Sequence, residues 1–209
     1  MKQNAKEAIL ARIRRATADS PTAPSIPHDF LTHDERNREA ILEEFIDRLI
    51  DYKAVVTHCS SADLPQTIAT ACEQLHITHL AIPSDVPSTW LPASVTVLSD
   101  DPPLSVDAID KSDGVLTGCA IGIAQTGTII LDGGATQGRR MLSLIPDRHL
   151  CVVFADQVVS LVPEAITRLQ EKRTQPITLI SGPSATSDIE LNRVEGVHGP
   201  RTLQVFVVG

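Results

Sequence analysis

In AVVTHCSSADLPQTIATACEQLHITHLAIP, residues 54–83, the pattern predicts a strand, a helix and a second strand in succession. Residues 54–58 and 78–83 are short runs rich in apolar and β-branched side chains, and residues 61–75 between them have the apolar spacing of a helix. Strands that alternate with helices are typical of α/β proteins with mainly parallel sheets. We therefore predict an α/β fold with a layered, mainly parallel sheet and flanking helices.

The same alternation continues on both sides of this stretch. On the N-terminal side, residues 34–52 are predicted to form a helix with Asp34 as its N-cap. On the C-terminal side, the pattern predicts helices at 138–145 and 163–173 and strands at 94–99, 113–118, 127–132, 150–154, 177–181 and 203–208.

The first 30 residues differ in character from the rest of the chain. Residues 3–16 place Ile9, Leu10 and Ile13 on one stripe, as in an amphipathic helix, and residues 19–30 contain three prolines, which favour extended backbone. We predict an N-terminal helical arm with a proline-rich linker over residues 1–30 and a single domain over residues 31–209. The apolar stripe of the arm is expected to dock on another subunit.

Composition limits the classes of function. A chain of 209 residues with 42% hydrophobic and 21% charged residues has the length and composition of one globular domain. A net charge of −8 and only 3% aromatic residues argue against nucleic-acid binding. The N-terminus lacks the apolar run of a signal peptide, and no stretch approaches the ~20 apolar residues that span a bilayer. We expect a cytoplasmic protein without a transmembrane segment.

No metal or nucleotide motif is recognisable in the sequence. The four cysteines lie far apart without a C-x-x-C pair, and the histidines lack metal-ligand spacing. P-loop, G-x-S-x-G and G-x-G-x-x-G motifs are also missing from the sequence. The sequence therefore predicts reduced, buried cysteines and no metal site.

The first candidate site lies within DGVLTGCAIGIAQTGTIILDGG, residues 113–134. Glycine is unfavourable inside strands, so Gly118, Gly122 and Gly127 suggest bulges or places where another backbone or a ligand approaches closely. For Gly118 and Gly122, tight sheet packing is the preferred explanation. Polar residues then interrupt the apolar run, which favours a turn whose side chains face a cavity. The candidate ligand-binding residues of this turn are Gln125, Thr126, Gly127 and Thr128.

The second candidate site is DGGATQGRRM, residues 132–141. Gly133 and Gly134 permit positive φ, so that successive amides form an anion-binding concavity, and Gly138 precedes a predicted helix whose N-terminus faces the same place. Arg139 and Arg140 add positive charge. Neighbouring helical residues point about 100° apart, so only one of the two arginines is expected to face a cavity. The alternative is an exposed turn with two solvated arginines.

The third candidate site, residues 179–201, has a strand followed by hydroxyl groups and free amides that suit a phosphate, carboxylate or amide ligand. Ordinary helix capping is the alternative. His198, Asp188 and Glu190 are candidates for acid–base catalysis. The candidate ligand-binding residues of this segment are Ser181, Gly182, Ser184, Thr186, Asp188, His198 and Gly199.

Two long segments resemble the lactate-utilization branch of the LUD domain family. They are TGCAIGIAQTGTIILDGGATQGRRMLSLIPDRHLCVVFADQVV (117–159) and ITLISGPSATSDIELNRVEGVHGPRTLQVFVV (177–208), and the similarity spans about residues 38–209. The resemblance implies a fold of the ribose-5-phosphate isomerase, CoA-transferase and formyltetrahydrofolate cyclo-ligase type. It also implies a role in oxidising L-lactate to pyruvate, in a system whose other members carry iron–sulfur clusters.

One residue departs from the family's pattern. The family motif usually reads Ala-Glu-Thr-Gly-Thr, and the matching position here is Gln125. A glutamine can act neither as a carboxylate nucleophile nor as a general base. The departure favours an accessory subunit that holds a partner or a small anion and binds no cofactor itself, with iron–sulfur clusters in its partner subunits.

Two alternatives to the accessory subunit remain open. In the first, the chain is a stand-alone enzyme that acts on a phosphorylated or carboxylate metabolite. Its acid and base would be His198, Asp188 or Glu190, and Arg139 or Arg140 would clamp the anion. In the second, the chain is a regulatory protein that binds such a ligand.

Overall fold

The computed structural model describes residues 5–18, 29–172, 175–183 and 199–209. The chain divides into two units, Met1–Phe30 and Leu31–Gly209. The first unit contains helix α1 (Ala5–Ala16), which has no buried residue and exposes Ile9 by 58% and Ile13 by 53%. The apolar stripe that the sequence predicts for this helix is therefore uncovered within its own unit.

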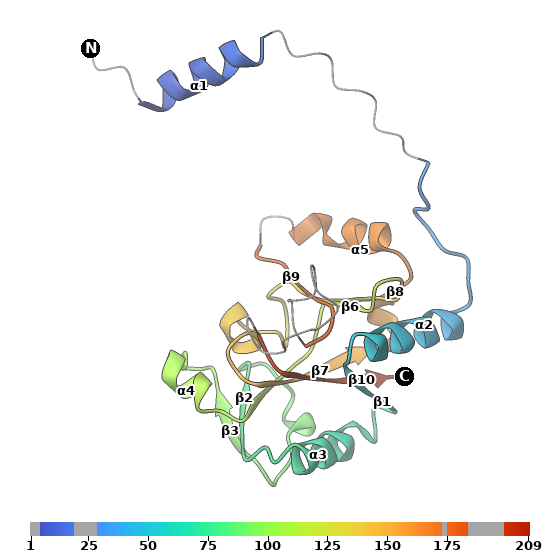
Figure 1. Cartoon of the computed structure of the whole chain (residues 1–209). Coiled ribbons are helices and arrows are strands. Elements are labelled where there is room, and N and C mark those ends of the chain that lie inside the picture. Colours follow the sequence, from blue (N-terminus) through green and yellow to red (C-terminus); the bar gives the residue numbers. More distant parts are fainter. Residues whose placement is uncertain (1–4, 19–28, 173–174, 184–198) are drawn as a thin grey trace. The chain divides into compact units, whose positions relative to one another are not determined.

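The second unit is built on a six-stranded sheet in which every hydrogen-bonded pair of strands is parallel (Figure 1). This sheet confirms the predicted α/β architecture. Its strands, in spatial order, are β1 (Val55–Cys59), β10 (Thr202–Val208), β7 (Arg148–Phe154), β4 (Gly114–Thr117), β2 (His79–Ile82) and β3 (Thr96–Ser99).

A second, four-stranded sheet was not predicted as a separate element. Its strands, in spatial order, are β8 (Val158–Val159), β5 (Ile121–Ile123), β6 (Thr128–Leu131) and β9 (Thr178–Ile180). Strand β6 is antiparallel to both β5 and β9, whereas β5 and β8 are parallel. Strands of two or three residues, one of them with a central glycine, carry too little periodicity to be recognised in a sequence.

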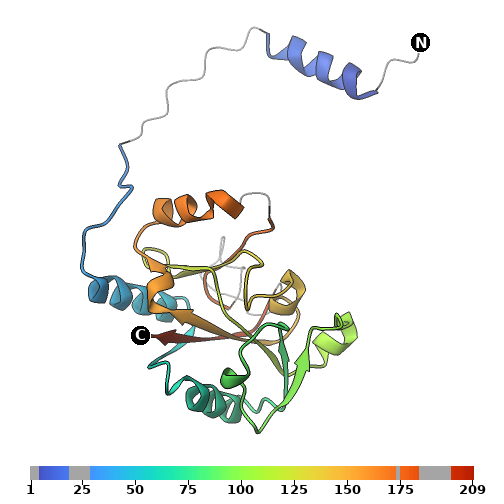
Figure 2. The same ribbon diagram turned by 180° about the vertical axis from the view of Figure 1, so that it is seen from behind.

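The helices of the second unit complete the layers on either side of the six-stranded sheet (Figures 1 and 2). Helix α3 (Leu64–Gln74) packs on one face, where Ile68 contributes to a core with residues of β4, β7 and β10. Helix α2 (Arg38–Asp51) and the second sheet cover the other face. Helix α5 (Val162–Arg168) packs on the second sheet. The short α4 (Val106–Asp110) precedes β4.

Phe45 of α2 is fully buried in a core that includes residues of both sheets. A Cβ atom added at Gly122 of β5 would lie 2.8 Å from Cζ of Phe45, so only glycine fits there. Gly118 is in similarly close contact with the hydroxyl of Thr136. The prediction that Gly118 and Gly122 serve tight packing is confirmed.

The predicted start of helix α2 is wrong. The helix begins at Arg38, and the N-cap is Asn37, whose side chain accepts a hydrogen bond from the Ala40 amide at 2.8 Å. Asp34 does not cap because its carboxylate is engaged by Arg36, whose Nε lies 2.7 Å from Asp34 Oδ2.

Two predicted helices are also shorter than expected. Within 138–145 only a 3₁₀ turn forms, η2 (Arg140–Ser143), because Gly138 has a φ of +65° and Pro146 cannot continue a helix. Helix α5 ends at Arg168 and continues only as the 3₁₀ turn η4 (Leu169–Lys172). The remaining 3₁₀ turns are η1 (Ser88–Trp90) and η3 (Ala155–Gln157).

Candidate functional site

Two adjoining cavities lie where η2, β9 and the amino ends of β7 and β10 meet. The first cavity has a volume of about 440 Å³, and the second of about 500 Å³. Both volumes are in the range of small-molecule sites. The two cavities share Arg140, Ser143 and Thr178 in their walls. Segments predicted separately as candidate sites therefore converge here, with Arg140 between the cavities and Ser181, Gly182 and Gly199 along the first.

The two neighbouring arginines have different environments. Arg139 donates from Nε to Asp100 Oδ2 at 2.7 Å and from Nη2 to Asp100 Oδ1 at 2.8 Å. This hydrogen bonding lowers the pKa of the Asp100 carboxyl. The side chain of Arg140 makes no hydrogen bond or ion pair within the described part of the chain, although its backbone carbonyl accepts a hydrogen bond from the Ser143 hydroxyl at 3.1 Å. Both arginines line the second cavity, but only Arg140 also lines the first.

The glycine loop after β6 does not form the predicted concavity of free amides. Gln137 Oε1 accepts hydrogen bonds from the amides of Asp132 at 2.6 Å and Gly133 at 3.2 Å. The Gly134 amide donates to Asp132 Oδ1 at 2.9 Å. Side chains of the loop therefore satisfy its own amides.

His149 lies in the wall of the first cavity and is only 1% exposed. Its Nε2 is 2.8 Å from the hydroxyl oxygen of Thr117. Burial lowers the pKa of His149 to about 4, so its imidazole is neutral at pH 7. The other ring nitrogen, Nδ1, makes no hydrogen bond with a described residue. Every buried side-chain nitrogen among the described residues has a hydrogen-bond partner. Nδ1 is therefore not fully buried and reaches the cavity surface.

Hydroxyl groups connect the turn between β5 and β6 to the first cavity. Thr126 Oγ1 lies 2.7 Å from Thr128 Oγ1, which lies 2.8 Å from Ser181 Oγ. Only Ser181 of these three lines the cavity. Gly127, with a φ of +56°, packs against the backbone of Arg48 in α2, where an added Cβ would lie 2.8 Å from the Arg48 carbonyl carbon. The glycine therefore serves the contact with α2.

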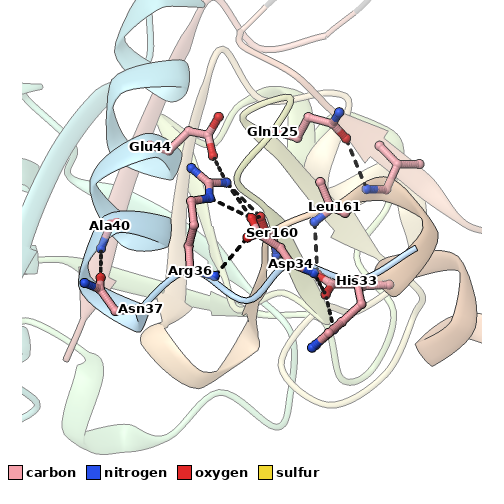
Figure 3. A network of polar contacts seen from close by, with 11 residues as sticks. His33, Asp34, Arg36, Asn37, Ala40, Glu44, Gln125, Ser160 and Leu161 are labelled. Carbon is pink, nitrogen blue, oxygen red and sulfur yellow. Dashed lines mark hydrogen bonds and ion pairs between the residues drawn. The ribbon is translucent and has the colours of Figure 1, made fainter. Parts of the chain in front are cut away.

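Gln125 lies in a different place, in the wall of a third cavity of about 670 Å³. Its Oε1 accepts a hydrogen bond from the Val162 amide at 3.4 Å. Figure 3 shows Gln125 beside a polar network that joins residues 33–36 to helix α2 and to Ser160, which follows strand β8. In this network Arg36 Nη2 lies 2.7 Å from Glu44 Oε2 and 2.9 Å from Ser160 Oγ. The structure thus separates Gln125 from Arg140.

Several predicted site residues lie outside the described residues. They are Ser184, Thr186, Asp188, Glu190 and His198. The three candidates for catalysis are all among them.

No group of three or more histidine, cysteine, aspartate or glutamate residues within the described ranges is arranged to hold a metal ion. All four cysteines are free, and Cys59 is less buried than Cys72, Cys119 and Cys151. None of the described helices is long and apolar enough to cross a membrane.

Several polar residues of the cavities were not predicted, among them His149 and Asp132. Asp132 follows β6 and lines the second cavity, and His149 is the second residue of β7. Each is a charged or titratable residue at the border of a run of buried apolar residues. A titratable residue at the border of a buried apolar run is the sequence signal that could have identified them, because a polar group is retained in a core only with hydrogen-bond partners or a ligand.

Comparisons with known proteins agree with this fold. The LUD domain family matches residues 42–208. The chain is 49% identical over 207 residues to lactate utilization protein C of Deinococcus radiodurans, covering 98% of this chain and 96% of that protein. It is also 32% identical over 105 residues to lactate utilization protein C of Anoxybacillus flavithermus, covering 50% of this chain and 47% of that protein.

A solved structure is similar as well. The crystal structure of a DUF162 family protein from Deinococcus radiodurans superposes with a TM-score of 0.73 at 46% identity. The superposition covers 83% of this chain and 99% of that one. The sequence match over most of the domain and this shared fold lead to one conclusion: the chain belongs to the LUD domain family.

Proposed function

We propose that this chain is an accessory, ligand-binding subunit of a cytoplasmic complex that oxidises L-lactate to pyruvate. It binds a small anion at Arg140, and the iron–sulfur clusters of the complex belong to partner subunits. The observation that carries the proposal is the position of Arg140, which lines two adjoining cavities and whose guanidinium has no hydrogen-bond partner among the described residues.

The chemistry of the cavities suits a carboxylate or a phosphate. A guanidinium group binds both anions in a two-pronged, charge-assisted geometry. Thr178 and Ser181 add hydroxyl groups to the first cavity, and His149 adds an uncharged imidazole. These neutral groups are able to hydrogen-bond the rest of a ligand while Arg140 holds its charge.

The accessory role is supported by Gln125 and by the names of the relatives. A glutamine supplies neither a nucleophilic carboxylate nor a base, and here its amide accepts the Val162 N–H away from the Arg140 cavities. Two relatives are named for lactate utilization. A non-catalytic subunit that binds the substrate or product of its complex accounts for both the glutamine at position 125 and the relatives' names.

The N-terminal arm is proposed to contact a partner subunit. Helix α1 carries Ile9 and Ile13 on an uncovered apolar stripe and basic residues on other faces, including Arg12 and Arg14. An apolar stripe of this kind is stable in water mainly when another surface covers it.

A stand-alone enzyme acting on a small phosphorylated or carboxylate metabolite is the second candidate function. The carboxylate of Asp132 in the same cavity as Arg140 favours it, because a carboxylate near a bound anion is able to serve as a general base. Turnover by the purified chain alone, lost in His198→Ala or Asp188→Asn, would support this candidate over the accessory subunit.

Replacing Arg140 by alanine is expected to weaken the binding of L-lactate and pyruvate by roughly 10- to 100-fold, the usual contribution of hydrogen bonds to a charged group. Calorimetric titration measures the change. The free energy of unfolding should change by no more than about 0.5 kcal/mol, because Arg140 is exposed and its side chain has no hydrogen bond or ion pair among the described residues to lose. Arg140→Lys, which keeps the charge without the fork, should give an intermediate affinity.

Arg139→Ala is the matched control for this experiment. It removes the pair with Asp100 and should lower the unfolding temperature, with a smaller effect on affinity. Equal weakening of binding by Arg139→Ala and Arg140→Ala would contradict the assignment of the anion to Arg140.

A further inference from the structure

Asp132 is a buried carboxylate in the wall of the second cavity. The residue is 7% exposed, and it directly follows strand β6 in the sequence. One carboxylate oxygen, Oδ1, accepts hydrogen bonds from the Gly134 amide and from Gln137 Nε2, both at 2.9 Å. Burying a carboxylate is costly unless it is hydrogen-bonded, so the position calls for an explanation.

The surrounding loop holds this carboxylate in one orientation. Gln137 is fixed in turn, because its Oε1 accepts the amides of Asp132 and Gly133. A side chain at residue 134 would displace this carboxylate, since an added Cβ would lie 2.8 Å from Asp132 Oδ1. The hydrogen bonds from Gly134 and Gln137 therefore fix Asp132 Oδ1, and with it the position of the second carboxylate oxygen, Oδ2.

That other oxygen, Oδ2, makes no hydrogen bond or ion pair with a described residue. No side-chain oxygen buried among the described residues lacks a partner, so Oδ2 reaches the surface of the second cavity. A hydrogen-bond acceptor that is held by its own loop in the wall of a cavity is suited to accept a hydrogen from a ligand.

Arg140 lines the same cavity, so a ligand there meets a cation and an anion together. A simple anion gains from Arg140 but is repelled by the Asp132 carboxylate. An anion with a hydroxyl group near its charge gains from both. We propose that Asp132 Oδ2 accepts a hydrogen bond from a hydroxyl group of the ligand held by Arg140, which makes the ligand class a hydroxylated carboxylate or phosphate. This inference rests on the proposed anion site at Arg140.

Matched pairs of probes test the inference by calorimetric titration. L-Lactate and propionate share a carboxylate and differ by one hydroxyl group, whereas glycerol 3-phosphate and propyl phosphate share a phosphate. In at least one pair, the wild-type protein should bind the hydroxylated member roughly 10-fold more tightly or better, as expected for a hydrogen bond to a charged group. The pair with the preference identifies the anion as carboxylate or phosphate.

Asp132→Asn should reduce this preference to near unity. The asparagine oxygen retains the hydrogen bonds from Gly134 and Gln137, and its NH₂ group takes the place of Oδ2, where it cannot accept a hydrogen. The probe without a hydroxyl group should bind more tightly than to the wild type, because a negative charge is lost. Asp85→Asn is the charge-matched control, since Asp85 is exposed and bonds to the Thr136 amide of the same loop. It should leave the preference unchanged.

The outcomes separate this inference from the proposed function. Binding without a hydroxyl preference in the wild type, or a preference that survives in Asp132→Asn, would overturn the role of Asp132 while the anion site at Arg140 stands. Failure of both pairs to bind would overturn the anion site and this inference together. If Asp132→Asn does not fold, the wild-type preference alone decides, and a ratio near one overturns the inference.

Discussion

Replacing Phe45 by alanine is expected to lower the free energy of unfolding by about 3–5 kcal/mol, the usual cost of truncating a buried phenylalanine. The ring is fully buried, and its core cluster includes Ala124 and Ile129 near the second sheet and Val153 and Val205 of the six-stranded sheet. Loss of the ring leaves a cavity where helix and sheets meet. Urea unfolding monitored by circular dichroism measures the change.

Two further variants make the Phe45 prediction specific. Ile166→Ala on α5, where the side chain is 50% exposed, should change stability by no more than about 0.5 kcal/mol. Gly122→Ala should itself cost about 1–3 kcal/mol, because its Cβ would meet the Phe45 ring. In combination with Phe45→Leu the cost of Gly122→Ala should fall. Strictly additive effects would show that this contact is not what requires glycine.

Acidification is expected to destabilise the protein through His149. In the unfolded chain this histidine takes up a proton near pH 6.5, whereas in the folded protein it does so only near pH 4. Between these values the unfolded state binds more protons, so stability falls as pH falls. The loss relative to pH 7 should reach about 1 kcal/mol at pH 5.5 and about 2.5 kcal/mol at pH 4.5.

The measurement is urea unfolding at pH 7.0, 5.5 and 4.5 for the wild type and His149→Gln. The difference between the two proteins isolates His149, because the carboxylates titrate in both. The stability of His149→Gln should fall less, by the amounts given above. His58→Gln, which replaces an exposed histidine, should keep the wild-type dependence. An equally steep loss of stability in His149→Gln would refute the assignment.

The six parallel strands could be predicted because each consists of a run of apolar residues long enough to show its period. In the second sheet, β6 and β9 were predicted as strands, whereas β5 and β8 were not, since they depend on pairing with each other over 35 residues or more of chain. The start of α2 was predicted wrongly for a related reason. Asp34 and Asn37 are both acceptable caps locally. The Asp34 carboxylate is instead engaged by Arg36 and by Ser160, and Ser160 is distant in sequence.

The candidate site shows the same limit. The Gly-Gly and Arg-Arg pairs drew attention to residues 132–141, but which arginine is available depends on Asp100, 39 residues away from Arg139. The loop amides were expected to bind an anion, yet Gln137 and Asp132 satisfy them. Gln125 and Arg140 lie in separate cavities, which spacing along the chain does not reveal. Local pattern located the loops, and long-range contacts determined the role of each residue.

Anaerobic purification from the native host tests the central claim most directly, with the tagged full chain compared with residues 31–209. The full chain should bring partner subunits with iron–sulfur absorbance and lactate-dependent reduction of an electron acceptor. Stripped of partners it should be inactive. Residues 31–209 should remain folded but retain fewer partners. A full chain that purifies colourless and alone, or that oxidises lactate by itself, would contradict the accessory-subunit proposal.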